Sequence, residues 1–298
     1  MKPYLLLFLI FSGLKLRSQD LSLAGQIVDK DTKKPIPGAT VGVRIKNFFL
    51  AAGGDGRFEL SYLRLAITDT LTISCLGYQT RHILIGKIKQ PLVVTMEQYL
   101  TQLSEVKIGL PTVEVGSKAD AHALTASFFP DMEAAMFMVG SPQKKGTIQA
   151  VGFYMSEGQA SARGDATAPF RIKIFGVSAD GSPGEELTDD LIIASAKANN
   201  EWFDIDLSPY HIKAPRDGFF VCFALLNKDY YLLGKDYKKD PLITKSIDVI
   251  TPRLGLTTDE FKEQLCFFRI NKGNNYGSWV KHLFNSNYMI RATIKLSK

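Results

Sequence analysis

The chain alternates short hydrophobic runs with turn-forming residues along most of its length, a pattern typical of β-strands. Within residues 41–45, valine and isoleucine alternate with Gly42 and Arg44, which predicts a strand with one buried and one solvated face. No helical period of useful length interrupts residues 21–96. This first region is therefore predicted to form strands at residues 22–28, 39–45, 48–52, 57–61, 71–75, 80–85 and 92–96.

Strand-like runs return after residue 134 and predict a second, larger region. In the run 202–207, Phe203, Ile205 and Leu207 share one face, opposite Trp202, and are the better core candidates. The segment 179–184 combines two glycines with Pro183, which predicts a turn. The clearest predicted strands of this region are residues 135–139, 147–155, 170–177, 191–196, 202–207, 219–226 and 288–296.

The segment between the two regions, residues 98–131, is rich in Gly, Ser, Ala and Pro. It contains one strand-like piece, residues 104–108, and we interpret it as a partly ordered linker. Residues 119–128 predict about two helical turns, with Ser117 as the N-cap. We therefore expect two separately folded domains, at residues 21–97 and 132–298.

The first residues predict a secretory signal peptide. A charged start at Lys2 precedes an apolar run, residues 4–14, that is too short to span a bilayer comfortably. We expect a signal peptide at residues 1–19, cut near Gln19 or Asp20, without a lipoprotein anchor because no cysteine is near that site. No later run is apolar enough for a membrane helix, so the mature chain is expected to have no transmembrane segment. The periplasm, the outer membrane and the cell surface are the locations that remain open.

Length and charge add two limits. A chain of 298 residues with 45% hydrophobic residues can bury two cores of ordinary size. The formal charge is +6, but removal of the leader with Lys2, Lys15 and Arg17 lowers it to +3. This modest charge does not imply a nucleic-acid partner.

The chain has three cysteines, Cys75, Cys222 and Cys266, without a CxxC spacing. The odd number leaves at least one of them free or paired between chains. Cys75 and Cys222 lie in apolar strand patterns and are interpreted as small buried hydrophobic residues. A bridge between Cys222 and Cys266 remains possible in an oxidising envelope.

Four short motifs in the first region together resemble the carboxypeptidase-like regulatory domain. They are residues 25–29 (GQIVD), 35–41 (PIPGATV), 55–58 (DGRF) and 76–78 (LGY), in the family's order. The resemblance implies a transthyretin-like, seven-stranded Greek-key sandwich, which recurs in Gram-negative envelope proteins, including periplasmic extensions of TonB-dependent transporters. Gly53 and Gly54 replace the family's usual threonine before the Asp-Gly turn, a change that loosens the turn.

The resemblance implies no catalysis, because the regulatory domain is an accessory of carboxypeptidases and has none of their zinc ligands. The chain contains no HxxE or HExxH spacing, and His82 is expected on a strand surface. We therefore expect no metal, no cofactor and no enzyme activity from this region.

A second, shape-level resemblance covers residues 170–226. The runs at 170–175 (FRIKIF), 202–208 (WFDIDLS) and 218–221 (GFFV), with the turn at 180–187, look like the jelly-roll, galactose-binding-like modules of secreted bacterial proteins. This resemblance implies an antiparallel two-sheet jelly-roll sandwich, and it carries no ligand residues over. The predicted fold class of the chain is all-β.

Exposed aromatic residues are the remaining site candidates. Tyr276, Trp279 and Tyr237 lie in late loops, where they are expected to stack on a sugar ring or to anchor a partner protein, unless they pack as ordinary loop residues. His122 and His282 have no triad or metal spacing around them, and no G-x-S-x-G or phosphate-binding motif is present.

Three functional hypotheses follow. The first is a non-enzymatic envelope protein that binds or assembles with an outer-membrane or envelope protein through protein–protein contacts. The second is a carbohydrate-binding module that presents aromatic side chains to glycans. The third is an enzyme with a cryptic site in the second region.

Overall fold

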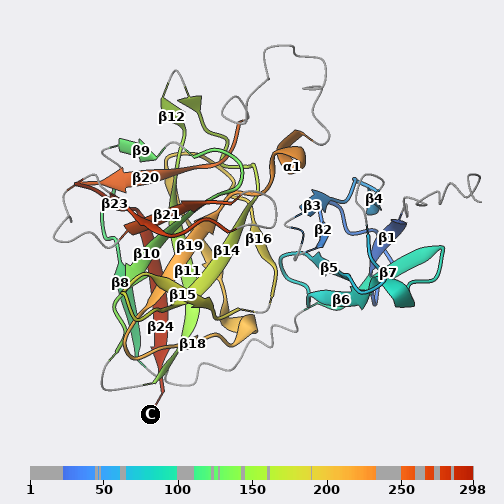
Figure 1. Cartoon of the computed structure of the whole chain (residues 1–298), viewed down its shortest axis with the longest axis horizontal. Coiled ribbons are helices and arrows are strands. Elements are labelled where there is room, and N and C mark those ends of the chain that lie inside the picture. The colour runs from blue at the N-terminus through green and yellow to red at the C-terminus, as the bar shows by residue number, and fades with distance from the viewer. Residues whose placement is uncertain are drawn as a thin grey trace, which may run out of the picture.

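The computed structural model describes most of the chain after the predicted leader. The described residues are 23–43, 46, 48–60, 65–98, 111–121, 124–126, 128–141, 145–159, 162–188, 190–232, 250–258, 266–271, 276–282 and 285–297. They form a smaller β-sandwich, built from β1 to β7, and a larger one, built from strands between β8 and β24 (Figure 1). The prediction of an all-β fold is confirmed. Within these ranges no helix is long and apolar enough to cross a bilayer.

The smaller sandwich pairs a three-stranded sheet, in the order β4-β1-β7, with a four-stranded sheet, in the order β3-β2-β5-β6. Only the β1–β7 pair is parallel among these described pairs. Each predicted run of the first region overlaps one strand. The strands are β1 (Leu23–Asp29), β2 (Thr40–Val43), β3 (Phe48–Ala51), β4 (Arg57–Leu60), β5 (Thr70–Ser74), β6 (Arg81–Leu84) and β7 (Leu92–Met96).

The core of the smaller sandwich is aliphatic. Ile27, Val41, Leu71, Ile73 and Val94 are all buried between the two sheets. In β4 the buried and exposed positions alternate, as the alternation of hydrophobic and polar residues predicts for a strand with one solvated face.

The carboxylate of Asp29, at the end of β1, ties the smaller sandwich together. Its Oδ1 accepts hydrogen bonds from the backbone N–H groups of Asp31 (2.9 Å) and Thr32 (2.7 Å). Its Oδ2 accepts from Tyr78 Oη (3.0 Å) and Gln98 Nε2 (2.9 Å). The bond from the Thr32 N–H, followed by those from the Thr32 and Tyr78 hydroxyls, holds the pKa of Asp29 well below its ordinary value. Tyr78 of the LGY motif therefore has a scaffold role.

The larger sandwich consists of two antiparallel sheets. The first has the order β15-β14-β19-β10-β21-β22, with β16 paired to β14, and the second has the order β23-β20-β11-β24-β8, with β17 and β18 paired to β11 and β9 to β20. The strands of the first sheet are β10 (Met132–Met138), β14 (Phe170–Val177), β15 (Pro183–Glu186), β16 (Ile192–Ala194), β19 (Phe219–Ala224), β21 (Cys266–Ile270) and β22 (Val280–Lys281).

The second sheet carries the long central strands. Its strands are β8 (Thr112–Gly116), β9 (Leu124–Ala126), β11 (Gly146–Ser156), β17 (Glu201–Asp206), β18 (Lys213–Ala214), β20 (Arg253–Thr257), β23 (Asn287–Tyr288) and β24 (Ile290–Leu296). A separate hairpin joins β12 (Gly158–Gln159) to β13 (Ala162–Arg163). The helical elements described are α1 (Lys228–Leu232) and two short 3₁₀ helices, Ile85–Lys87 and Ser208–Tyr210. The Greek-key and jelly-roll connectivities themselves remain predictions.

Part of the segment interpreted as a linker belongs to the larger sandwich. β8 pairs with β24 and β9 pairs with β20, both antiparallel. The helix predicted at residues 119–128 is wrong, because β9 occupies its second half. Pairing with β20 and burial of Ala126 and Phe128 in the core outweigh a weak helix propensity. The predicted strand 104–108 and the signal peptide lie outside the described residues.

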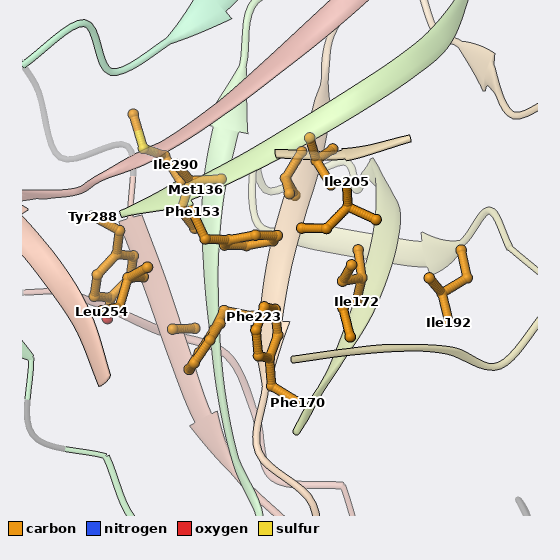
Figure 2. Close-up of a cluster of buried hydrophobic side chains, with 14 of the residues drawn as sticks. Met136, Phe153, Phe170, Ile172, Ile192, Ile205, Phe223, Leu254, Tyr288 and Ile290 are labelled. Carbon is orange, nitrogen blue, oxygen red and sulfur yellow. The ribbon is translucent and has the colours of Figure 1, made fainter. Parts of the chain in front are cut away.

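Phenylalanine rings from both sheets form the centre of the larger core (Figure 2). Phe153 of β11 meets Phe170 of β14 edge to face at a centroid distance of 5.2 Å. Phe170 in turn lies 4.5 Å from the ring of Phe223 on β19. Ile172, Ile205 and Ile290, which are also drawn in Figure 2, fill the space around these rings. Face-to-face packing of the two sheets thus rests on aromatic contacts.

The two sandwiches contact each other directly. Phe49 of β3 is buried within the hydrophobic cluster of the larger sandwich, and α1 packs against β3. Ser74 Oγ donates a hydrogen bond to the carbonyl oxygen of Leu191, and Thr40 Oγ1 lies 3.4 Å from Tyr230 Oη. Figure 1 shows β16 on the side of the larger sandwich that faces β2, β3 and β5. This contact positions the candidate site described next.

Candidate functional site

A cavity of about 520 Å³ opens where the two sandwiches meet, and we call it the cleft. Its volume is within the usual range for ligand sites, which often lie between domains. The smaller sandwich contributes Gly38, Thr40, Ala51, Ser74, Cys75 and Leu76. The larger sandwich contributes Asp165, Thr167, Ala168, Pro169, Ile193, Ala194, Ser195, Tyr230 and Tyr231.

Small side chains bring the backbone close to the cleft on its smaller-sandwich side. Gly38 begins the chain segment that leads into β2, and its φ of +69° favours glycine. An added Cβ at this position would meet no atom within 4 Å. In the strands that flank β2, Ala51 is the last residue of β3 and Ser74 is the last residue of β5. Cys75 follows Ser74. The wall therefore offers main-chain groups and short side chains to a ligand.

Two buried tyrosines from α1 close another side of the cleft. Tyr231 Oη donates to the carbonyl oxygen of Pro169 (2.9 Å) and accepts from the N–H of Leu226 (3.1 Å). Burial raises the pKa of both Tyr230 and Tyr231, so both phenols are protonated at neutral pH. Because the hydroxyl of Tyr231 already has protein partners, this residue positions the chain around the cleft.

Asp165 is the one charged residue among the described residues that line the cleft. Its Oδ1 accepts hydrogen bonds from the N–H (3.0 Å) and the Oγ1 (2.6 Å) of Thr167. A lining with one carboxylate and no basic side chain repels an anionic ligand. The cleft is suited to a neutral or cationic ligand.

Cys75 lines the cleft and is partly exposed, whereas Cys222 and Cys266 are buried. Burial raises the pKa of all three thiols, that of Cys266 to about 12. Cys222 belongs to the cluster on the outer face of the seven-stranded sheet, and Cys266 belongs to the core on the inner face. β10 also lies between their strands, so the bridge left open by the sequence does not form.

Tyr276 and Trp279 do not line the cleft and instead lie over the outer face of the seven-stranded sheet. The guanidinium carbon of Arg269 is 4.2 Å from the Trp279 ring centroid and 4.8 Å from that of Tyr276. Phe175 meets Trp279 edge to face at 5.5 Å. Tyr276 is 49% exposed, whereas Trp279 is half-buried. Tyr237, the third predicted aromatic, lies outside the described residues.

Glu133 of β10 anchors this outer-face cluster, which we define as Glu133, Lys173, Arg269, Tyr276 and Trp279. Its Oε1 pairs with Lys173 Nζ (2.5 Å), and its Oε2 pairs with the guanidinium of Arg269 (2.7 Å). Burial alone would raise the pKa of Glu133, but attraction to Lys173 and Arg269 lowers it overall. The cluster is a compensated set of buried charges under an aromatic cover.

The described residues contain no group of three or more His, Cys, Asp or Glu that could hold a metal ion. The structure shows one serine–histidine contact that the sequence did not indicate. In it, His282 Nε2 lies 3.0 Å from Ser286 Oγ. Both side chains are more than nine tenths buried, and burial lowers the pKa of His282. This pair therefore links the residue after β22 to the residue before β23 and is shielded from solvent.

No motif in the sequence pointed to the cleft, because its lining is assembled from short segments far apart in the chain. Apart from Asp165 and the two tyrosines, the lining residues are small or aliphatic, types that single-sequence reasoning assigns to turns and cores. The predicted strands 39–45, 48–52, 71–75 and 191–196 each contain lining residues, but the sequence did not indicate that they come together.

Comparison with known proteins identifies the smaller sandwich. Residues 23–108 match the family model of the CarboxypepD_reg-like domain, which confirms the resemblance carried by the GQIVD, PIPGATV, DGRF and LGY motifs. No curated protein matches the chain.

Two solved structures from clostridia are weakly similar to the chain. One contains the cysteine protease and lectin-like domains of Cwp84, a surface layer associated protein of Clostridium difficile, at 13% identity and a TM-score of 0.34. The other is the clostridial cysteine protease Cwp84 after propeptide cleavage, at 13% identity and a TM-score of 0.38. The matches cover 57% and 62% of this chain but only 33% and 40% of those chains.

Proposed function

We propose that this protein is a non-enzymatic binding module of a Gram-negative cell envelope that engages a partner protein in the cleft between its two sandwiches. The observation that carries this proposal is a cavity of about 520 Å³ whose walls come from both sandwiches. The regulatory-type domain supports the envelope location, and the apolar leader at residues 4–14 supports export.

The chemistry of the cleft supports binding without catalysis. Its lining offers hydroxyl and main-chain groups, one carboxylate and two buried phenols, and it contains no histidine, lysine or arginine. A general acid–base mechanism needs a second titratable group within hydrogen-bond reach of the reacting atoms. Besides Asp165, the titratable groups of the described lining are one thiol and two phenols, and burial raises the pKa of all three.

The test is site-specific photo-crosslinking in the producing cells. A photoreactive amino acid at Ser195, which is exposed in the cleft wall, is expected to form a covalent adduct with one envelope protein. The matched control is the same amino acid at Val280, which is exposed on β22 and does not line the cleft. Adducts of equal yield at both positions, or at Val280 alone, would contradict the proposal.

A carbohydrate-binding role is the second candidate, favoured by one observation. Tyr276 is half exposed beside Trp279, an arrangement that can stack on a sugar ring. Against it, Arg269 already occupies a face of the Trp279 ring. Binding to a glycan panel that is lost in both Tyr276→Ala and Trp279→Ala would favour this candidate over the cleft.

An enzyme with a cryptic site is the third candidate. It would be supported by a hydrolase activity that disappears when a defined polar cluster is changed. Ser286→Ala is the informative variant, because Ser286 and His282 are the one serine–histidine contact noted among the described residues. We expect this variant to leave any measured activity of the protein unchanged.

A further inference from the structure

The larger sandwich presents one short sheet edge to the cleft. β16 pairs with β14 through the registers Phe170–Ala194, Arg171–Ile193 and Ile172–Ile192, and with no other strand of the described residues. Ile193, Ala194 and Ser195 all line the cleft. An edge strand of this kind has backbone N–H and C=O groups without a neighbouring strand.

The hydrogen bonds on either side of β16 show which backbone groups face the cleft. The carbonyl oxygen of Leu191 accepts from Ser74 Oγ of the smaller sandwich, so it points away from β14. The N–H of Ala196 donates to Ala166, in the segment that leads into β14, at 3.0 Å. Backbone groups alternate in direction along an antiparallel strand. Ile193 and Ser195 therefore direct their N–H and C=O groups away from β14 and toward the smaller sandwich.

The space in front of this edge suits a backbone. At Leu191 the smaller sandwich covers the edge through Ser74, whereas at Ile193 and Ser195 the edge faces the cavity of about 520 Å³. Gly38 and Ala51 on the opposite wall have short or no side chains, so they leave room for a chain between the two sandwiches.

Other ligand classes fit the cleft less well. A sugar needs an open aromatic face, but Tyr230 and Tyr231 are buried and meet each other nearly edge to face, at 6.0 Å and 72°. An anion needs a basic partner, and no basic side chain is among the lining residues described. What the cleft does offer, alternating main-chain donors and acceptors, is complementary to an extended polypeptide.

We infer that the ligand of the cleft is an extended polypeptide segment, neutral or basic, that pairs with Ile193 of β16 and with Ser195 just after it, and so adds a strand to the seven-stranded sheet. This inference rests on the proposed function and specifies its ligand. Main-chain hydrogen bonds provide the affinity in such a complex, and the alternate side chains of the segment contact the walls.

The first test compares two capped peptides with the full mature chain. The probe is acetyl-Val-Thr-Val-Thr-Val-amide, and its control carries N-methyl groups on two consecutive central residues, which removes the donors on either edge. We expect the probe to shift the amide resonances of Ile193 and Ser195. We expect the N-methylated peptide to bind up to about tenfold more weakly, because one main-chain hydrogen bond to the sheet edge is lost whichever edge of the peptide pairs. Equal affinity of the two peptides, or no shift with the probe at millimolar concentration, would overturn the inference.

The second test changes Ser195, the residue that follows β16. Ser195→Pro removes the N–H that faces the cleft without removing a bond to β14, and Ser195→Ala keeps that N–H. We expect about tenfold weaker probe binding in Ser195→Pro and unchanged binding in Ser195→Ala. If Ser195→Pro does not fold, the N-methylated peptide decides alone. An envelope partner crosslinked at Ser195 together with equal binding of both peptides would retain the proposed function and reject β16 pairing.

Discussion

The cleft and the outer-face cluster both gather aromatic and polar residues on the larger sandwich, but they differ in what they leave open to a ligand. In the cluster, Glu133 is paired with Lys173 and Arg269, and the aromatic rings cover these charges. In the cleft, a cavity lies in front of a sheet edge whose backbone groups have no neighbouring strand in the described part of the chain. The charged and aromatic side chains of the cluster are therefore interpreted as structural, whereas mainly small side chains surround the candidate site.

The largest effect is expected from Glu133→Ala, which tests whether the cluster is structural. The substitution leaves the buried ammonium of Lys173 and the guanidinium of Arg269 without their anion, and we expect it to lower the free energy of unfolding by about 3–5 kcal/mol. Both tryptophans, Trp202 and Trp279, are in the larger sandwich, so tryptophan fluorescence during denaturant unfolding measures this loss.

The matched control is Asp204→Ala, because Asp204 forms a solvent-exposed pair with Arg291. Its removal is expected to cost at most about 1 kcal/mol. A loss in Glu133→Ala as small as that in Asp204→Ala would show that the cluster is not needed for folding and is free to act as a site.

The next effect, from Phe49→Ala, tests whether the two sandwiches form the cleft by docking. Phe49 comes from β3 but is buried in the core of the larger sandwich, and we expect its truncation to cost about 3 kcal/mol, detected by tryptophan fluorescence. Phe58→Ala is the control, since Phe58 is buried within the smaller sandwich alone. If both variants change the tryptophan transition equally, the contact through Phe49 does not couple the sandwiches.

Trp279→Ala is expected to have a smaller effect and tests the carbohydrate alternative. Loss of the stacking on Arg269 should lower the free energy of unfolding by about 1–2 kcal/mol, with no loss of ligand binding in the cleft. Tyr276→Ala should cost less, because its ring is half exposed. If Trp279→Ala is as stable as the wild type but no longer binds a glycan, the outer-face cluster is the binding site and the assignment of that role to the cleft is wrong.

The smallest effect is expected from acid. The pKa of Asp29 is lowered in the folded protein, so its hydrogen bonds stabilise the smaller sandwich above the unfolded-state pKa of about 3.9 and lose this contribution as the pH falls further. Thermal unfolding followed by circular dichroism should show a steeper loss of stability below that pH in the wild type than in Asp29→Asn. Parallel pH profiles of the two proteins would contradict the role of Asp29.

The sequence predicted the scaffold well because local patterns determine it. Alternating apolar residues and glycine or proline turns located each strand that the structure describes in the smaller sandwich, and the four motifs indicated the family whose model matches it. The late strands β20 and β21 were missed. β20 buries the polar Arg253 and Thr257 together with its apolar residues, and β21 is a short run of five residues that fully buries only Cys266 and Phe267. The helix predicted at residues 119–128 failed because pairing with β20 is a long-range contact.

The candidate site was not predictable from the sequence. Ser195, Gly38 and Cys75 are small residues without a chemical signature, and their convergence depends on how Phe49 docks one sandwich on the other. Tyr276 and Trp279 had the clearer signature, yet the structure places them over Arg269 and outside the cleft. Arg269 and Glu133 lie 136 positions apart in the chain, so their pairing gave no local signal.

The most direct test of the central claim is the alkylation rate of Cys75, which lines the cleft while Cys222 and Cys266 are buried. Iodoacetamide at mildly alkaline pH should modify Cys75 slowly in the purified protein, because burial raises the pKa of its thiol, and should spare the other two cysteines. In the intact envelope we expect Cys75 to be protected, because a partner segment occupies the cleft. Alkylation of Cys75 at the same rate in the envelope and in the purified protein would contradict the account.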